Sequence, residues 1–199
     1  MSGAAPQPAT IGEFLQIPED RRFHELVGGE IVEKATPSGE HGDAQAGIVG
    51  AIRPAYQRRS RDGGPGGWWI ATEVEVLLES ALLGSAEVVR PDVLGWRRER
   101  VPTRPVGFPV SIRPDWICEV VSPANANTDT VKKLRVYHRA NVVHYWLVDP
   151  RDATLTVMRW TDAGYTMVLR AERGETVRPE PFDGIELVLG TLFGDDPPE

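Results

Sequence analysis

The sequence predicts a single α/β domain in which a mixed β-sheet is flanked by helices. The segment Val142–Asp149 is almost entirely apolar, as expected of a central strand that is covered on both faces. Pro114–Pro123 reads as a second apolar strand, and a helical pattern over Thr128–Ala140 separates the two. A helix between two apolar strands is a βαβ crossover, so we expect these strands to be parallel and the connection to be right-handed.

The N-terminal part should form a short helix and a β-hairpin. Thr10–Glu13 has the capping-box pattern, which predicts a helix that ends near Pro18. Phe23–Lys34 predicts a hairpin that turns at Gly28–Gly29, a dipeptide typical of two-residue turns. Glu25 would then lie on the first arm of this hairpin.

A longer helix and further strands follow. Residues Ser38–Arg59 predict a helix, which Pro54 should kink or end. The apolar residues at one-turn spacing in this segment are Ala44, Ile48 and Ile52. The remaining strands are expected over Trp68–Glu79, Glu87–Trp96, Thr154–Arg159, Tyr165–Arg170 and Glu186–Leu189. The stretch Arg97–Arg113 is the longest expected loop, either a functional flap or a mobile segment.

Composition restricts the class of protein and its location. The chain has 199 residues, 41% of them hydrophobic, so one domain with a sizeable core is the simplest organisation. We expect a flexible N-terminal tail over 1–9, the domain over 10–193 and an acidic tail over 194–199. The sequence has no signal-peptide pattern and no apolar run near the roughly 20 residues that span a bilayer. The single cysteine, Cys118, suits a reducing cytoplasm and is expected to be buried filler.

Two carboxylates lie on apolar, strand-like segments. Asp92 follows Pro91 in one of them, and Glu119 lies within Ile117–Val121 in the other. A carboxylate between β-branched apolar neighbours is costly to bury unless a cation or hydrogen-bond donors satisfy it. Two such carboxylates with a lysine are the groups that a metal-dependent phosphodiester hydrolase needs.

Lys133 is the lysine that the helical pattern puts in an unusual place. At about 100° per residue, it falls on the apolar side of the predicted helix. That side also carries Leu134, Val136, Tyr137 and Ala140, and the opposite side carries Lys132, Arg135 and Arg139. A lysine is almost never buried without a partner, so Lys133 should meet a carboxylate or a substrate group. The alternative is a local pair with Asp129, one turn earlier on the same face.

Several short motifs occur in a defined order along the chain. They are Phe23–Ile31, Pro37–Ser38 with His41, Pro91–Val93, Ile117–Pro123, Asp129–Lys133 with Tyr137, Tyr145–Pro150 and Leu189–Phe193. In this order and spacing they resemble the Uma-two family of restriction-endonuclease-like proteins, within the PD-(D/E)xK nuclease superfamily. The likeness extends from about Thr10 to Phe193. It implies a restriction-endonuclease-like fold and a metal-dependent nuclease site.

The resemblance also implies roles for individual residues. Asp92 and Glu119 would hold Mg²⁺ or Mn²⁺, with the main-chain carbonyl of Val120 as a further ligand. The superfamily motif expects a lysine two positions after the glutamate, where this chain has Val121. The Uma-two family similarly carries a helix lysine instead, which matches Lys133. Lys133 would therefore position the attacking water or neutralise charge on the phosphate.

Three further side chains are candidates for the same site. Glu25 would complete a metal shell or orient the water, or else hold the hairpin through hydrogen bonds. His41 matches a family position and would touch a phosphate or a metal-bound water, or else bond to the backbone at a helix start. Asp129 is a candidate for contact with the substrate or for support of Lys133 from outside the metal shell.

The sequence therefore predicts a metal-dependent endonuclease that hydrolyses phosphodiester bonds, most simply in DNA. Cutting both strands of a duplex usually takes two sites, which is compatible with a homodimer. The alternative is a non-catalytic nucleic-acid-binding or interaction module on the same fold, favoured by the net charge of −7 and by Val121. The arginine-rich stretches 53–61 and 97–104 are either nucleic-acid contacts or solvated loops. The tryptophans beside loops, which are candidates for stacking on a base, are Trp68, Trp69 and Trp96.

Overall fold

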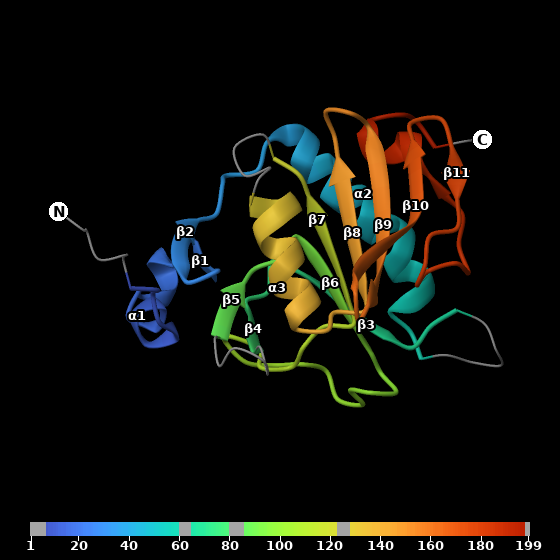
Figure 1. Ribbon diagram of the computed structural model, residues 1–199. Helices are drawn as coiled ribbons and strands as arrows, with labels where there is room; N and C mark the ends of the chain where they lie inside the picture. Colours follow the sequence, from blue (N-terminus) through green and yellow to red (C-terminus); the bar gives the residue numbers. More distant parts are fainter. Residues whose placement is uncertain (1–6, 60–64, 80–85, 123–127, 198–199) are drawn as a thin grey trace.

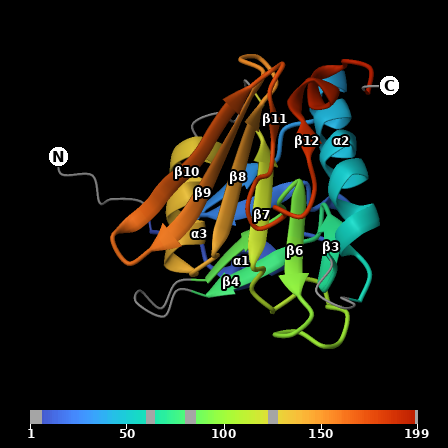
Figure 2. The ribbon, with the colours of Figure 1, turned by 90° about the vertical axis from the view of Figure 1, so that its right-hand side faces the viewer.

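A six-stranded mixed β-sheet with a main helix on each face forms the centre of the structure (Figures 1 and 2). The computed structural model describes residues 7–59, 65–79, 86–122 and 128–197. In spatial order, the strands are β10 (Gly164–Glu172), β9 (Thr154–Thr161), β8 (His144–Asp149), β7 (Trp116–Val120), β6 (Val93–Arg97) and β3 (Trp68–Thr72). Strands β7 and β8 are parallel, as predicted for two strands joined by a helix, and the other neighbours in this sheet are antiparallel.

The two covering helices differ in length and in how they begin. Helix α2 (Gly39–Tyr56) is capped by Ser38, whose hydroxyl accepts the main-chain N–H of His41. It ends two residues after Pro54, which agrees with the predicted effect of that proline. On the other face, a turn of π-helix, η2 (Thr128–Lys133), leads into helix α3 (Leu134–Arg139). Figure 2 shows the sheet between α2 and α3.

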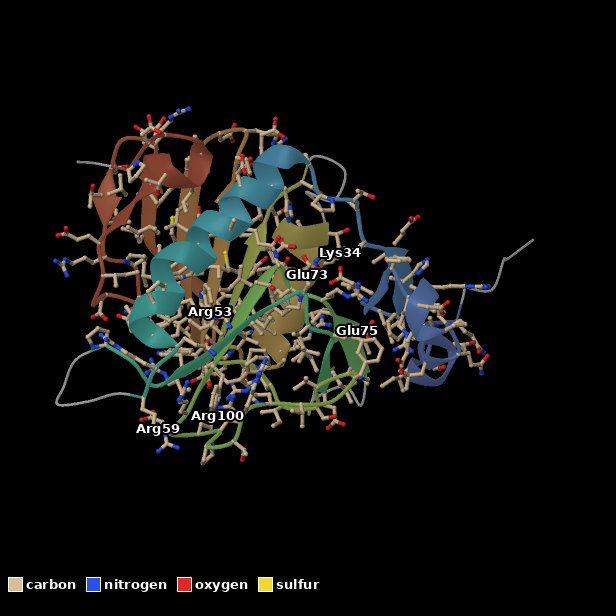
Figure 3. All side chains as sticks on the ribbon, turned by 180° about the vertical axis from the view of Figure 1, so that it is seen from behind. Lys34, Arg53, Arg59, Glu73, Glu75 and Arg100 are labelled. Atoms are coloured by element: carbon tan, nitrogen blue, oxygen red, sulfur yellow. The ribbon has the colours of Figure 1, made fainter. Side chains whose placement is uncertain are left out.

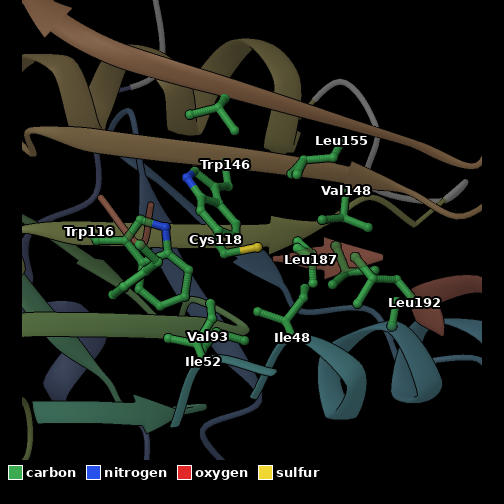
Figure 4. Packing of buried hydrophobic residues seen from close by; sticks show 14 of the residues in the cluster. Ile48, Ile52, Val93, Trp116, Cys118, Trp146, Val148, Leu155, Leu187 and Leu192 are labelled. Atoms are coloured by element: carbon green, nitrogen blue, oxygen red, sulfur yellow. The ribbon is translucent and has the colours of Figure 1, made fainter. Parts of the chain in front are cut away.

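Alternation along β7 divides the core between these two helices. Trp116 and Cys118 point toward α2 and pack against its apolar stripe (Figure 4). Ile117 points toward α3, so Glu119, two residues later, shares that side of the sheet. Cys118 is buried as predicted, and burial raises the pKa of its thiol, with the nearby Asp92 and Glu119 adding to the shift.

A second sheet adjoins the first, and here two predictions of single strands are wrong. Trp68–Glu79 forms β3 and then β4 (Val76–Glu79), and Glu87–Trp96 belongs to β5 (Ala86–Val89) and then β6. In the second sheet the order is β2-β1-β5-β4, where β1 (His24–Val27) and β2 (Glu30–Glu33) are the predicted hairpin. Its turn residues Gly28 and Gly29 both have positive φ, as a tight hairpin turn requires.

Both long segments bend at the same level, which is why they change sheets. Glu73 has φ of 55° and ends the pairing of β3. In the partner segment, Pro91 precedes Asp92 and has no N–H to donate to a ladder, although its carbonyl still accepts the N–H of Glu73 at 3.1 Å. Glu73 and Asp92 therefore lie at the junction between the two sheets.

A buried ion cluster fixes the second sheet to the chain before it. Glu75 accepts hydrogen bonds from Arg22 at 3.1 Å and from Arg90 at 2.9 Å. The main-chain N–H of Arg90 donates to Glu25 on β1 at 2.6 Å. Paired and hydrogen-bonded in this way, the buried carboxylates have the partners that burial demands.

The predicted loop Arg97–Arg113 is fastened at several points. Asp115 accepts the main-chain N–H of Arg97 and the side chain of Arg100, both at 2.7 Å. The indole N–H of Trp69 donates to the carbonyl of Val101, and the indole N–H of Trp96 donates to the carbonyl of Ile112. These bonds hold the loop against the ends of β3 and β6.

The terminal segments add short elements around the sheets. These are α1 (Ile11–Leu15) with the predicted capping box, η1 (Glu19–Arg21), β11 (Thr176–Val177), β12 (Leu187–Val188) and η3 (Leu189–Phe193). Ala9 donates a main-chain hydrogen bond to Gly29, while residues 1–6 lie outside the described chain. Near the other end, Arg173 pairs with Asp195. Within the described ranges, no helix is long and apolar enough to cross a membrane.

Stability should fall as the pH is lowered because of His144, which is buried at the start of β8. Burial lowers the pKa of His144 to about 4, although the charge of Glu180 opposes the shift. Between the ordinary histidine pKa of 6.5 and about 4, the unfolded chain binds more protons than the folded one, so stability decreases toward low pH in this window. The loss should be about 2–3 kcal/mol.

Urea unfolding at a series of pH values checks this, with His144→Phe as the comparison. The variant should lose less stability than the natural chain between about pH 6.5 and pH 4. Equal slopes for the two proteins over this window would contradict the assignment to His144.

Candidate active site

Asp92 and Glu119 come together because their strands pair in register. Val93 on β6 lies opposite Cys118 on β7, so Asp92 lies opposite Glu119. Side chains directly opposite in an antiparallel pair approach to about 5 Å on the same face. Their residues are 2% and 1% exposed, so two carboxylates share one buried position and require positive charge around them.

Lys133 meets carboxylates, as expected of a lysine on the apolar side of the helix. It is 2% exposed, and its Nζ atom lies 2.9 Å from Glu25 Oε2 and 3.1 Å from Glu119 Oε1. The hydroxyl of Tyr137 also donates to Glu119 Oε1, and burial raises the pKa of this tyrosine, with the charges of Glu119 and Glu25 adding to the effect. The local alternative involved Asp129, whose side chain lies outside the described residues.

Asp92 is surrounded by donors from three elements. Its Oδ2 atom accepts the main-chain N–H of Val120 at 2.7 Å, and its Oδ1 atom lies 3.0 Å from Lys34 Nζ and 3.3 Å from His41 Nε2. Burial alone would raise the pKa of Asp92. The hydrogen bond from His41 and the charges of Lys34 and Lys133 outweigh burial and hold this pKa well below its usual value. These contacts therefore favour the ionised form of Asp92.

His41 does more than begin α2. Its main-chain N–H bonds to Ser38, as the simpler alternative expected, but its ring contacts Asp92. The Nδ1 atom of the ring is buried without a hydrogen-bond partner among the described residues. A buried ring nitrogen of this kind is a position at which a water or a substrate oxygen could bond.

Lys34 and Glu73 belong to this site, and the sequence analysis did not identify them. Lys34 Nζ donates to Glu73 Oε2 and to the carbonyl of Arg90, both at 2.7 Å, in addition to its contact with Asp92. Figure 3 shows Lys34 and Glu73 close together. Burial would lower the pKa of Lys34, but the charges of Asp92, Glu119 and Glu73 raise it overall. The amide of Gln45 on α2 donates to the carbonyl of Asp92 at 2.8 Å and completes this side of the site.

Glu25 holds the hairpin, which is one of the two roles that the sequence left open, and it also contacts Lys133. Its Oε1 atom accepts the main-chain N–H of Arg90, which ties β1 to the end of β5. Its Oε2 atom pairs with Lys133. Glu25 thus holds the hairpin and also balances the buried lysine, while its place in a metal shell stays a prediction.

Two hollows of very different size meet at this site. A cavity of about 10 Å³ has room for roughly one water molecule. Its lining includes Lys34, His41, Asp92, Glu119, Val120 and Lys133. A pocket of about 560 Å³ shares Lys34 and His41 with it and adds Gln45, Glu73 and Arg90. Lys34 and His41 therefore stand between the buried carboxylates and a pocket large enough for a substrate group.

The donor chemistry of the site fits a hard divalent cation. The site contains four carboxylates (Glu25, Glu73, Asp92, Glu119) and two lysines (Lys34, Lys133), which leaves an excess of negative charge. Oxygen donors of this type suit Mg²⁺ and Mn²⁺. In the described part of the chain, no three His, Cys, Asp or Glu side chains form a cluster that could hold a metal. A cation here would depend on the Asp92–Glu119 pair and on the main-chain oxygen of Val120.

Comparison with known proteins places this geometry in context. Residues 11–190 match the Uma2 family model, which is described as "Putative restriction endonuclease". The chain is also similar to the crystal structure of "a putative nuclease belonging to DUF820" from Anabaena variabilis ATCC 29413. The two share 23% sequence identity with a TM-score of 0.75, over 94% of this chain and 98% of that chain. At this identity the likeness shows the fold, and it confirms the predicted single mixed α/β domain. No curated protein matches the chain.

Removing the buried ammonium should destabilise the protein strongly. Lys133→Met leaves Glu25 and Glu119 buried without their shared cation, which should lower the free energy of unfolding by about 3–5 kcal/mol. The neighbouring Lys132 makes an exposed pair with Glu30 at 2.6 Å, so Lys132→Met should cost less than about 1 kcal/mol.

Chemical denaturation of both variants measures the difference. Equal losses of stability in Lys133→Met and Lys132→Met would mean that the buried charge balance is not as described.

Proposed function

The chain belongs to the Uma2 family, and from this premise we propose that it is a metal-dependent endonuclease that hydrolyses phosphodiester bonds, most simply in DNA. The observation that carries the proposal is the pair of buried carboxylates, Asp92 and Glu119, on opposite positions of one antiparallel ladder. Two lysines and a histidine surround this pair, next to a pocket that admits a substrate group. Such a combination is what metal-assisted phosphodiester hydrolysis requires.

Asp92, Glu119 and the carbonyl of Val120 are the groups that would hold Mg²⁺ or Mn²⁺. Bound there, the ion would polarise a phosphate oxygen and acidify a water molecule. Asp92 is suited to this role because its pKa is held low and because the N–H of Val120 fixes its orientation. Tyr137 and Lys133 orient Glu119 in the same way.

The two lysines, Lys133 and Lys34, would have different roles in the reaction. Lys133 lines the small cavity and not the larger pocket, so it can position a water beside Glu119. Lys34 lines the larger pocket as well, so its ammonium can reach a phosphate oxygen and offset the charge that develops there. His41 Nδ1, which has no partner in the described structure, supplies a further bond to a water or to the phosphate.

The second candidate function is a nucleic-acid-binding module without turnover. One observation favours it: both oxygens of Asp92 already have partners in Val120, Lys34 and His41, so this carboxylate is balanced without a metal. The two candidates differ in their need for a cation, since a pure binding module has no use for Mg²⁺ or Mn²⁺.

Asp92→Asn should abolish cleavage while leaving the fold intact, because the amide keeps the shape of the carboxylate but loses its charge. Purified protein would be incubated with plasmid and with single-stranded DNA in EDTA, Mg²⁺ or Mn²⁺. We expect metal-dependent cleavage by the natural chain and a loss of at least about a hundredfold in the variant. Calorimetric titration with Mn²⁺ should show the matching loss of metal binding.

Asp43→Asn is the matched control, because Asp43 is exposed on α2. It should cleave as the natural chain does. Cleavage by Asp92→Asn at the natural rate would refute the assigned site, and DNA binding without cleavage in any metal would favour the binding module.

Lys34→Met tests the lysine that the sequence analysis did not identify. If Lys34 offsets charge on the phosphate, its loss should slow cleavage by roughly ten- to a hundredfold, with metal binding retained. Lys132→Met removes a partly exposed lysine outside the site and serves as the control in the same assay. Unchanged cleavage in Lys34→Met would leave Lys34 with a purely structural role.

A further inference from the structure

A second hollow lies at the opposite end of the β3–β6 pair from Glu73 and Asp92. It is a groove of about 720 Å³, larger than the pocket beside the carboxylates. Four arginines line it, namely Arg59, Arg97, Arg98 and Arg104, and among the residues that the structure describes Glu99 is the one carboxylate in its lining. We call this surface the arginine groove.

The positive charge of the arginine groove is not balanced by ion pairs with the described residues. Within the described ranges, none of its four arginines forms an ion pair with a carboxylate, whereas arginines elsewhere do, such as Arg22 with Glu75 and Arg100 with Asp115. The whole chain carries a net charge of −7, so this local excess has the opposite sign to the protein. A cluster of unpaired guanidinium groups on an acidic protein indicates an anionic ligand.

Two of these guanidinium groups are held in fixed positions. Arg98 lies 3.6 Å from the centre of the Trp69 ring, and its side chain donates to the carbonyls of Trp68 and Gln57. Arg97 lies 4.7 Å from the centre of the Trp68 ring. Burial lowers the pKa of Arg98, and the neighbouring charge of Arg59 adds to the effect. Side chains ordered in advance lose less entropy when they bind an anion, and the planar guanidinium matches phosphate oxygens.

Base stacking, by contrast, has little support here. Trp68 and Trp96 are each 2% exposed, so the expectation that their rings stack on a base is wrong for this structure. Arg98 covers a face of Trp69. The arginine groove is thus a surface for phosphates, because its exposed chemistry is that of guanidinium groups.

The groove and the carboxylate pair are linked by rigid elements. Strand β3 leads from Trp68 in the groove to Glu73 at the site, and these five residue-to-residue steps span about 16 Å. Helix α2 follows the same course, with exposed Arg53 between the two ends (Figure 3). At about 3.4 Å per nucleotide along one strand, this distance corresponds to roughly five nucleotides.

We propose that the arginine groove binds the phosphodiester backbone of a nucleic acid, about five nucleotides from the position held by Asp92 and Glu119. The inference rests on the proposed function for the class of substrate. The groove contacts phosphates and not base edges, so it sets the position along the nucleic-acid strand at which the carboxylates act.

Direct binding measurements test the groove independently of cleavage. Arg59→Ala/Arg104→Ala removes two exposed guanidinium groups from the groove. Arg170→Ala/Arg173→Ala removes the same charge from exposed positions on and beside β10, at the opposite edge of the six-stranded sheet. Anisotropy of a labelled oligonucleotide, single-stranded and duplex, would be followed in EDTA at a series of salt concentrations.

The groove variant should bind about tenfold more weakly near physiological salt, and the slope of log affinity against log salt should fall by about 1.4–1.8. The control should keep both the affinity and the slope of the natural chain. Equal weakening of the two variants would overturn the proposal, because net charge alone would then explain it. Natural affinity in the groove variant would overturn it as well.

The two proposals can fail separately. Loss of binding in the groove variant, with no cleavage by the natural chain in any metal, would support the arginine groove and refute the nuclease. Cleavage that depends on Asp92 but not on Arg59 and Arg104 would support the nuclease and refute the groove.

Discussion

The pairing of β6 with β7 puts two carboxylates opposite each other inside the protein. The surrounding elements supply the donors and positive charges that these carboxylates need. Asp92 and Glu119 cannot both be buried and ionised without positive charge nearby. The groups that contact these carboxylates come from three separate parts of the chain: the ammonium of Lys34 at the end of the hairpin, the imidazole of His41 at the start of α2, and the ammonium of Lys133 at the end of η2. The hairpin, α2 and the turn before α3 therefore converge on one ladder position.

The bend between the two sheets follows from the same requirement. If β3 and β6 continued straight, Glu73 would lie on a flat strand rather than at a junction. The positive φ of Glu73 and the missing N–H of Pro91 end the first sheet at this point. The change of direction brings the second sheet, with Glu25 on β1, close enough to pair with Lys133. A local backbone feature thus decides which carboxylates can reach the site.

The parts of this arrangement that the sequence predicted are those with a local pattern. Glu119 is a charged residue within an apolar strand, and Lys133 is a charged residue on the apolar side of a helix. A charge at an apolar position can be recognised from a few neighbouring residues. Lys34 shows no such conflict, because a lysine at a hairpin end is ordinarily exposed; only the pairing with Asp92, 58 residues away, gives it a role. The division of β3 from β4 was missed for a related reason, because a glutamate gives no indication in the sequence of a positive φ such as that of Glu73. Pro91, in contrast, was a signal that the strand containing it should end.

The fixed register of the ladder also links the carboxylate end of β3 and β6 to their other end. A carboxylate pair that depends on exact ladder register cannot shift relative to Trp68 and Arg97 without breaking the pairing that creates it. Arg98 is in turn held by the carbonyl of Trp68 on the same strand. An anion bound between these arginines would therefore stand at a fixed distance from Asp92, and that distance is set by strand geometry rather than by a flexible loop. In this fold, the ladder register that buries Asp92 and Glu119 at one end also fixes the arginine groove at the other end. A nucleic-acid strand bound in the groove would therefore be positioned relative to these carboxylates.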